Sequence, residues 1–201
     1  FYKYGITSNG LYNNQKNLVL GIGGDSGSGK TTLLEIIELL FNERFLKIEG
    51  DAEHKWERGH SKWKTMTHLS PKANNIYRQA KAINDLKNNK SVLLREYDHT
   101  DGVFTKPKKV KPKDFIAISG LHPFYLPKLR KNIDIKIYVD TDEDLRKHWK
   151  LKRDFKERNY SIDNILSQIN KRSKDAKKYI HPQRDFADII IRFSPNKSFD
   201  F

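Results

Sequence analysis

The segment GDSGSGKT, at positions 24–31, matches the phosphate-binding loop pattern GxxxxGK[ST] in full. An apolar run precedes it at residues 18–22, and a stretch with helical character follows at residues 32–41. The pattern has a physical meaning only between a strand and a helix, and both flanks occur here in that order. The segment therefore predicts a strand, a loop and a helix that together bind the phosphates of a nucleoside triphosphate.

The residue types of this segment suit that task. Glycines let the main chain approach phosphate oxygens closely, and the first turn of the helix adds unpaired amide donors at its positive end. Lys30 can reach the β and γ phosphates, and the Thr31 hydroxyl is suited to ligate Mg²⁺. A glycine-rich turn that binds nothing is the alternative. The nucleotide-binding residues that the pattern predicts are Gly24, Asp25, Ser26, Gly27, Ser28, Gly29, Lys30, Thr31 and Thr32.

Length and pattern predict one α/β domain over residues 17–201, with a central, mainly parallel sheet flanked by helices. Residues 1–16 are polar and rich in Asn and Tyr, and we expect a linker or a hairpin there. Because the first residue is Phe1 rather than Met, we expect the sequence to be part of a longer or processed chain.

Composition narrows the class of protein. The chain has no cysteine, which excludes disulfides and zinc thiolate sites and favours a reducing cytoplasm. It has no apolar stretch of about 18 residues and no signal-peptide pattern, so we expect a soluble protein without a membrane partner. The net charge of +14 indicates an anionic partner. The lysines form no single stripe, and the basic run at 106–113 reads as a solvated loop, so nucleic-acid binding is the weaker option. The oligomeric state is left open.

Apolar runs predict six strands and four helices that largely alternate along the chain. Alternation of this kind favours a parallel sheet, whose ligands bind at the carboxyl ends of the strands. The predicted strands are 18–22, 45–48, 91–94, 115–118, 133–139 and 187–193, and the predicted helices are 32–41, 71–88, one starting at Thr141 and one starting at Ser161.

Further strings give a more specific indication than the loop alone. In chain order they are IEGDAEHKWER (48–58), HLSPKAN (68–74), EYDHTDG (96–102), SGLHPFY (119–125), KLKRDFKERNYS (150–161) and YIHPQ (179–183). In order and coverage the chain resembles the phosphoribulokinase and uridine kinase family, and within it the phosphoribulokinase branch most closely. The resemblance extends from about residue 18 to residue 193.

The resemblance implies a kinase fold and a set of roles. Asp51 would be the base that accepts the proton of the acceptor hydroxyl, acting with Lys30 and with Arg153 of a basic lid. Thr31 and Asp51 would face Mg²⁺. The residues implied to bind the acceptor or the phosphates are His54, Arg58, His68, Tyr97, His99, Lys150 and Arg158.

Each of these residues also has a plain structural interpretation. Asp51 could be a turn residue after a strand, and His54 and Arg58, four residues apart, could share a helix face. A lone histidine such as His68 or His122 is often a satisfied structural residue. Single residues of the basic lid could lie on a solvated helix face.

One position departs from the family pattern. Where the family places a Glu before Gly-Leu-His, this chain has Ser119, which cannot supply a charge to Mg²⁺. Three explanations stay open. The first is that Mg²⁺ needs only Thr31, Asp51 and the nucleotide phosphates as ligands. The second is that activity is reduced or lost. The third is that another carboxylate takes over, for which the candidates are Glu49, Glu96 and Asp98.

The functional expectation is an ATP-dependent and Mg²⁺-dependent kinase that phosphorylates a hydroxyl of a sugar phosphate or related polyol, with ribulose 5-phosphate as the best single candidate. One alternative is a nucleoside kinase similar to uridine kinase. Another is a nucleotide-binding regulatory domain with little or no turnover, for which Ser119 is the motivating residue.

Overall fold

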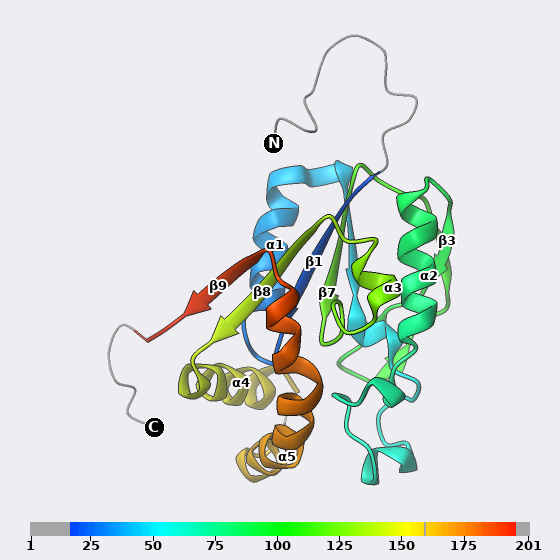
Figure 1. Ribbon diagram of the computed structural model, residues 1–201. Coiled ribbons are helices and arrows are strands. Elements are labelled where there is room, and N and C mark those ends of the chain that lie inside the picture. The colour runs from blue at the N-terminus through cyan, green and yellow to red at the C-terminus, as the bar shows by residue number, and fades with distance from the viewer. Residues whose placement is uncertain (1–16, 159, 196–201) are drawn as a thin grey trace.

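The chain, described by a computed structural model over residues 17–158 and 160–195, with side chains to 156 and again from 160, is built on one parallel sheet. The strand order is β2-β7-β1-β8-β9 (Figure 1). This confirms the predicted fold class, whereas residues 1–16 lie outside the described part. The five strands are β1 (Leu18–Gly24), β2 (Phe45–Glu49), β7 (Phe115–Gly120), β8 (Ile135–Thr141) and β9 (Ile189–Phe193).

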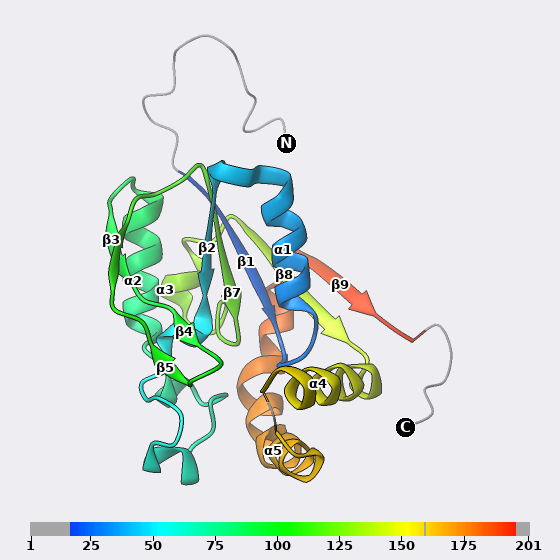
Figure 2. The same cartoon turned by 180° about the vertical axis from the view of Figure 1, so that it is seen from behind.

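Helices cover both faces of this sheet, which explains the near-continuous apolar runs of its central strands. α1 (Lys30–Phe41) packs on one face, where Leu34 meets Ile22 of β1. α2 (Ile76–Lys87) and α3 (Pro127–Arg130) pack on the opposite face through Ile83 and Leu129 (Figures 1 and 2). Two helices, α4 (Glu143–Arg158) and α5 (Ile162–Asp175), lie beyond the carboxyl ends of the strands. Short helical turns connect these elements: η2 (Asn42–Arg44), η3 (Gly50–Glu53), η4 (Ser61–Lys64), η5 (Pro71–Ala73), η6 (Ala176–Ile180) and η7 (His181–Phe186).

The predicted helix starts hold to different degrees. The Ser161 side chain accepts a hydrogen bond from the Asn164 N–H at 3.3 Å, which confirms the predicted N-cap of α5. The predicted helix over 71–88 is wrong at its start, because α2 begins only at Ile76. Residues 71–73 form a separate turn, and Asn74 is extended, with φ −128° and ψ 149°. Asn74 leaves the helical path because its side chain bonds to His54 and to two nearby carbonyl groups.

Two small antiparallel ribbons lie outside the main sheet. β3 (Val92–Leu94) pairs with β6 (Lys108–Val110), and β4 (Tyr97–Asp98) pairs with β5 (Val103–Phe104). The basic run at 106–113 is therefore not simply a loop, since it contains β6. Its lysines still point to solvent, so the local pattern showed exposure but not the long-range pairing. Within the residues described, no helix combines the length and the apolar character needed to cross a membrane.

The ring of Phe124 packs closely against Gly21 of β1, the strand that leads to the phosphate-binding loop. Phe124 is fully buried, and a Cβ atom added to Gly21 would lie 2.6 Å from Phe124 Cε1 and 3.0 Å from Ile133 Cδ1. A side chain at Gly21 can be accommodated only if the aromatic ring moves.

We therefore expect Gly21→Ala to destabilise the protein by about 1–3 kcal/mol through overpacking. Since Phe124→Leu removes the atoms that clash, the double variant should lose less than the sum of the single losses, with a coupling of about 0.5–3 kcal/mol. Urea unfolding of the wild type and the three variants measures this. Strictly additive losses would show that the two residues do not compete for the same space.

Candidate active site

The loop between β1 and α1 has the backbone that the sequence pattern predicts. Gly24, Gly27 and Gly29 have φ angles of 146°, 81° and 92°, a region that side chains disfavour. A Cβ atom on Gly24 would also lie 2.6 Å from the Val139 carbonyl oxygen of β8. These positions therefore require glycine, and the expected order of strand, loop and helix is confirmed.

The loop presents unpaired hydrogen-bond donors. Among the described residues, none accepts a hydrogen bond from the backbone N–H of Gly27, Gly29 or Lys30. The Ser28 hydroxyl is buried and likewise has no partner within the described chain. Because α1 starts at this point, its positive end adds to the attraction for an anion. The loop is thus suited to bind phosphate oxygens.

Lys30 is held over this loop. Its Nζ donates to the Gly24 carbonyl at 3.0 Å and to the Asp25 carbonyl at 2.6 Å. Burial lowers the pKa of Lys30 to about 8, against the opposing effect of the Asp25 and Asp51 carboxylates. Its charge therefore depends on pH close to the physiological range, and a bound polyphosphate would stabilise the charged form.

Asp25, which the pattern places in the loop, contacts other protein residues through its carboxylate. Its carboxylate accepts from the Ser26 N–H at 2.6 Å and lies 3.4 Å from His181 Nε2 and 3.6 Å from Arg146 Nη1. Burial alone would raise the pKa of Asp25, but His181, Arg146 and the Ser26 N–H together hold it below its usual value. The ionised carboxylate thus ties the loop to α4 and to η7.

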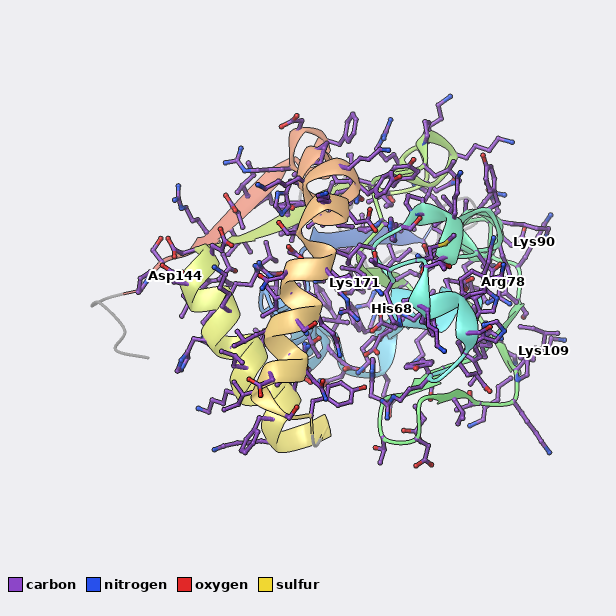
Figure 3. All side chains as sticks on the ribbon, turned by 90° about the horizontal axis from the view of Figure 1, so that it is seen from below. His68, Arg78, Lys90, Lys109, Asp144 and Lys171 are labelled. Atoms are coloured by element: carbon purple, nitrogen blue, oxygen red, sulfur yellow. The ribbon has the colours of Figure 1, made fainter. Side chains whose placement is uncertain are left out.

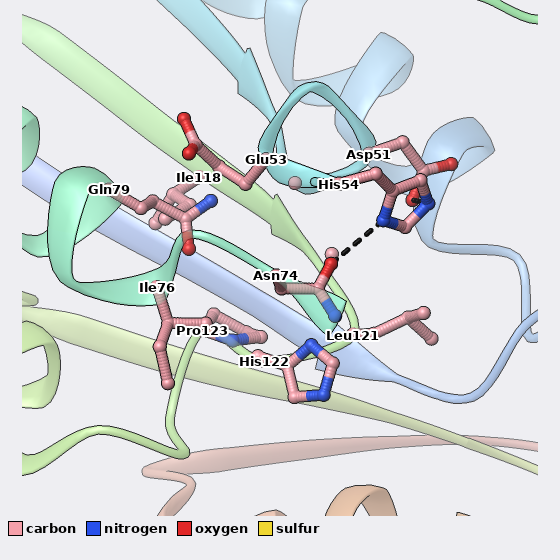
Figure 4. Close-up of a pocket in the computed structure, with 12 residues that line it drawn as sticks. Asp51, Glu53, His54, Asn74, Ile76, Gln79, Ile118, Leu121, His122 and Pro123 are labelled. Atoms are coloured by element: carbon pink, nitrogen blue, oxygen red, sulfur yellow. Dashed lines mark hydrogen bonds and ion pairs between the residues drawn. The ribbon is translucent and has the colours of Figure 1, made fainter. Parts of the chain in front are cut away.

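Asp51 emerges directly after β2, on the η3 turn. Its Oδ2 lies 3.2 Å from His99 Nε2, and its Oδ1 lies 3.6 Å from His54 Nε2. On the other side of the His54 ring, Nδ1 lies 2.7 Å from Asn74 Oδ1 (Figure 4). If Nδ1 carries the proton and donates it to Asn74, Nε2 is left as an acceptor facing Asp51. A cavity of about 10 Å³, large enough for about one water, lies beside these residues.

The His68 ring stacks on an aromatic ring and accepts a hydrogen bond from a cation. Its ring lies 3.8 Å from the Trp63 ring at an interplanar angle of 11°, and its Nδ1 lies 3.2 Å from Arg172 Nη2 of α5. Burial, and then the Arg172 charge, lower the pKa of His68 to about 2. The imidazole is therefore neutral and accepts from Arg172. Figure 3 shows His68 beside α5, which also carries Lys171.

Arg58 holds the β4–β5 hairpin in place. Its guanidinium donates to the Thr100 carbonyl at 2.9 Å and to the His99 carbonyl at 2.5 Å. The hairpin carries Tyr97, whose ring centroid is 5.1 Å from that of His99 and 5.8 Å from that of His54. Arg58 thereby helps to position the imidazole that contacts Asp51.

The basic residues predicted to form a lid lie on α4. Arg153 Nε and Nη2 donate to Asp154 Oδ1 at 2.9 and 2.8 Å, and Lys150 forms a buried ion pair with the same carboxylate. Burial lowers the pKa of Lys150 to about 8, although Asp154 opposes this. Lys150 thus points to a protein carboxylate, whereas Arg153 also faces the cavity described next. Arg158 ends α4, and its side chain lies outside the described residues.

Most of the predicted residues line a single cavity of about 1240 Å³ at the carboxyl end of the sheet. Gly24, Asp25 and Lys150 do not line it. His122 does not line it either; it is buried, with Nε2 2.9 Å from the Leu69 carbonyl oxygen, and supports the fold. The predicted residues that line the cavity are Ser26, Gly27, Ser28, Gly29, Lys30, Thr31, Thr32, Asp51, His54, Arg58, His68, Tyr97, His99 and Arg153.

Other lining residues were missed by the sequence analysis. They come from α4, α5, the residues between these helices and the segment before α2. No local pattern separates them from ordinary surface residues, although the string KLKRDFKERNYS (150–161) contains Lys152, Lys156 and Tyr160. The missed residues include Trp63, Trp149, Lys152, Lys156, Tyr160, Lys171 and Arg172.

The cavity also offers oxygen donors that suit a hard cation. Thr31 is exposed in the first turn of α1, and its hydroxyl shares the cavity with the carboxylates of Asp51 and Glu49. Within the described residues, no three His, Cys, Asp or Glu side chains gather to hold a metal by themselves. Mg²⁺ bound with a nucleotide does not need such a cage, because phosphates and water supply most of its ligands. The donor set therefore fits Mg²⁺ delivered with a nucleotide.

Comparison with known proteins adds independent findings. The model of the phosphoribulokinase / uridine kinase family matches residues 19–199. The phosphoribulokinase of Synechocystis sp. is 36% identical over 181 residues, which cover 90% of this chain and 54% of that protein. The uridine kinase of Lactobacillus helveticus is 33% identical over 183 residues, which cover 88% of this chain and 87% of that protein. This chain thus spans about half the length of the phosphoribulokinases that it matches.

The fold is also similar to solved structures. The phosphoribulokinase from Rhodobacter spheroides superposes with a TM-score of 0.73 at 22% identity, over 89% of this chain and 71% of that chain. At this identity the likeness concerns the fold, and it agrees with the parallel sheet described above.

The lowered pKa of Lys30 makes nucleotide binding depend on pH. Above about pH 8 the side chain loses its charge, so affinity for a non-hydrolysable ATP analogue should fall as pH rises from 7 to 9, by at most about tenfold per pH unit. Lys30→Arg keeps its charge over this range and should bind with little pH dependence. Calorimetric titration at each pH measures both proteins. If affinity falls equally with pH in the wild type and in Lys30→Arg, the titrating group is another residue, such as Lys150.

Proposed function

Since the chain belongs to the phosphoribulokinase / uridine kinase family, we propose that it transfers the γ-phosphoryl group of ATP to a hydroxyl group of a sugar phosphate. Ribulose 5-phosphate is the first acceptor to test. One observation carries the proposal: Lys30 of the phosphate-binding loop, the Asp51 carboxylate and the cations of α5 all open onto one cavity. Donor, base and anion-binding groups thus share one space.

In the proposed reaction, the acceptor oxygen attacks the γ phosphorus of ATP. A new bond forms between this oxygen and phosphorus, the bond from phosphorus to the β–γ bridging oxygen breaks, and ADP leaves with that electron pair. Asp51 takes the proton of the acceptor hydroxyl. Lys30 and Arg153 offset negative charge on the transferred group, and positioning with such charges supplies most of the rate in phosphoryl transfer.

The histidine that the β4–β5 hairpin places beside Asp51 supports its role as a base. His99 Nε2 lies 3.2 Å from Asp51 Oδ2, and the hairpin that Arg58 supports holds this ring, so His99 constrains the carboxylate. A fixed carboxylate within reach of the acceptor hydroxyl avoids the cost of reorganisation during proton transfer. We propose that Tyr97 shapes the acceptor site from the same hairpin.

A phosphorylated acceptor is favoured by cations that protein carboxylates do not neutralise. In the described structure, Lys171 Nζ donates to the carbonyls of Trp63 and Lys64 at 3.3 and 3.1 Å, and Arg58 likewise donates to carbonyls. Both side chains line the cavity, and their hydrogen-bond partners among the described residues are neutral carbonyl groups. Arg172, whose Nη2 lies 3.2 Å from His68 Nδ1, also lines the cavity. Charged hydrogen bonds of this kind bind phosphate strongly.

Two finer parts of the proposal rest on the chemistry of the residues. Thr31 and Asp51 would face Mg²⁺ bound with the nucleotide, where the cation would supply positive charge to the phosphates. Arg158 would contribute charge from the end of α4, whereas Lys150 would act through its buried ion pair with Asp154, which holds α4 beside the loop. A cytoplasmic location is also proposed, on the basis of the sequence alone.

A nucleoside acceptor is the second candidate, because the rings of Trp63 and Tyr97 line the same cavity and could contact a base. A regulatory domain with little turnover is the third, because Ser119 supplies no charge at its position. A panel of sugar phosphates, polyols and nucleosides, with ATP, Mg²⁺ and detection of ADP, separates these possibilities. ATP binding without ADP release under every acceptor would favour the regulatory role.

Replacing the proposed base tests the reaction directly. We expect Asp51→Asn to lower kcat by about 10²–10⁴-fold, because the amide cannot accept the proton, while affinity for an ATP analogue stays nearly unchanged. Steady-state ADP release and calorimetric titration measure the two effects. Asp101→Asn is the matched control, since Asp101 is exposed on the β4–β5 hairpin, which also carries His99, and does not line the cavity. Full turnover by Asp51→Asn would remove Asp51 as the base.

Lys171 tests the class of acceptor. Lys171→Met should raise KM for a sugar phosphate by about 10–100-fold, the value of a charged hydrogen bond, with little change in KM for ATP. An uncharged nucleoside should show no such change. Lys174→Met serves as the control, because Lys174 is exposed on the same helix and does not line the cavity. An unchanged KM for the sugar phosphate would place its phosphate elsewhere.

A further inference from the structure

Glu49 ends β2 at the same level as Ser119 of β7. The parallel register pairs Glu49 with Ser119, and Ser119 in turn with Ile22 of β1, two residues before the phosphate-binding loop begins at Gly24. Residues paired in this way direct their side chains to the same face of a sheet, and neighbouring strands lie about 4.8 Å apart. The Glu49 carboxylate is thus one strand away from the position of Ser119.

The face in question is the one that α1 covers. Ile22 packs against Leu34 of α1 on this face. Lys47, two residues before Glu49 and on the same side of β2, pairs with Glu38 of α1 at 3.2 Å. Because α1 runs antiparallel to β2, the next step along the strand brings Glu49 toward the first turns of the helix, where Thr31 lies.

The cavity confirms this placement. Glu49 is exposed, and it lines the cavity together with Thr31, Asp51 and Ser119. Among the described residues, no side chain or backbone group forms a hydrogen bond or ion pair with the Glu49 carboxylate. A carboxylate of this kind can turn to a cation without breaking an existing interaction.

The two other carboxylates that the sequence suggested for this role are excluded by their positions. Glu96 and Asp98 do not line the cavity, and the Asp98 carboxylate accepts from the Thr100 N–H at 2.7 Å within its own turn. Asp51 lines the cavity but also contacts His99 and His54 and is the proposed base, so it does not by itself replace the absent carboxylate. Glu35 also lines the cavity, one turn beyond Thr31 on α1, and serves as the comparison residue in the test.

We propose that Glu49 supplies, from β2, the carboxylate that faces the divalent cation bound with the nucleotide, in place of a carboxylate at Ser119. The inference rests on the proposed function, since it assumes a nucleotide bound with a divalent cation. Carboxylate and hydroxyl oxygens are the protein ligands that Mg²⁺ prefers, and it keeps several waters and phosphate oxygens as its remaining ligands. Thr31, Glu49 and Asp51 then surround this cation from a helix, a strand and a turn.

The test measures Mn²⁺, which replaces Mg²⁺ and has an electron paramagnetic resonance signal when free. Mn²⁺ is titrated into the protein with a saturating, non-hydrolysable ATP analogue, for the wild type, Glu49→Gln, Ser119→Glu and the double variant. Glu49→Gln should weaken Mn²⁺ binding by about 10–100-fold. The double variant should recover most of this loss, because it returns a carboxylate to the adjacent strand. Glu35→Gln, which lines the same cavity, is the control and should bind as the wild type does.

The outcomes separate this inference from the proposed function. Mn²⁺ affinity within twofold of the wild type in Glu49→Gln would overturn the role of Glu49 and leave the kinase proposal intact. A wild type that binds no Mn²⁺ with the nucleotide would overturn both. If Glu49→Gln loses Mn²⁺ affinity and the wild type turns over no acceptor, the role of Glu49 at the cation is supported and the kinase proposal is overturned.

Discussion

The site depends on the parallel pairing of β2, β7 and β1. This register brings the end of β2, which leads to Asp51, to the same edge as the end of β1, which leads to the phosphate-binding loop. Gly50 and Gly120 follow at this edge, where a Cβ atom on Gly50 would lie 3.1 Å from the Gly120 Cα. A side chain on either glycine would push these two backbone segments apart by a few tenths of an ångström, so the glycines favour the close approach from which Asp51 enters the cavity.

Electrostatics then divides the cavity into regions of different character. Near the loop, burial lowers the pKa of Lys30 to about 8, whereas Asp25 stays ionised through His181 and Arg146. Near α5, the described hydrogen-bond partners of Lys171 are neutral carbonyl groups and not carboxylates. A desolvated cation such as Lys30 attracts phosphate more strongly than an exposed one, and Lys171 adds an exposed cation to the same cavity.

Local patterns predicted those parts of the fold that depend on neighbouring residues. The loop, the strands of the main sheet and the Ser161 cap follow from glycine spacing, apolar runs and a side-chain hydrogen bond. The start of α2 did not follow, because Asn74 is held by the distant His54. Strand β6 did not follow either, since its pairing with β3 joins residues that a local window does not compare. Lys171 and Arg172 looked like any basic residues on a helix surface until α5 was placed against the segment that contains His68.

The sequence by itself determined the phosphate-binding loop, the class of fold and the family, because glycine spacing and the order of short strings carry that information without tertiary contacts. It named Glu49, Glu96 and Asp98 equally as substitutes for the carboxylate absent at Ser119. Only the tertiary structure separated them, because strand register and cavity access are properties of distant segments in contact. The same holds for Lys150, whose charge is directed to Asp154 by a packing of α4 that no local pattern encodes.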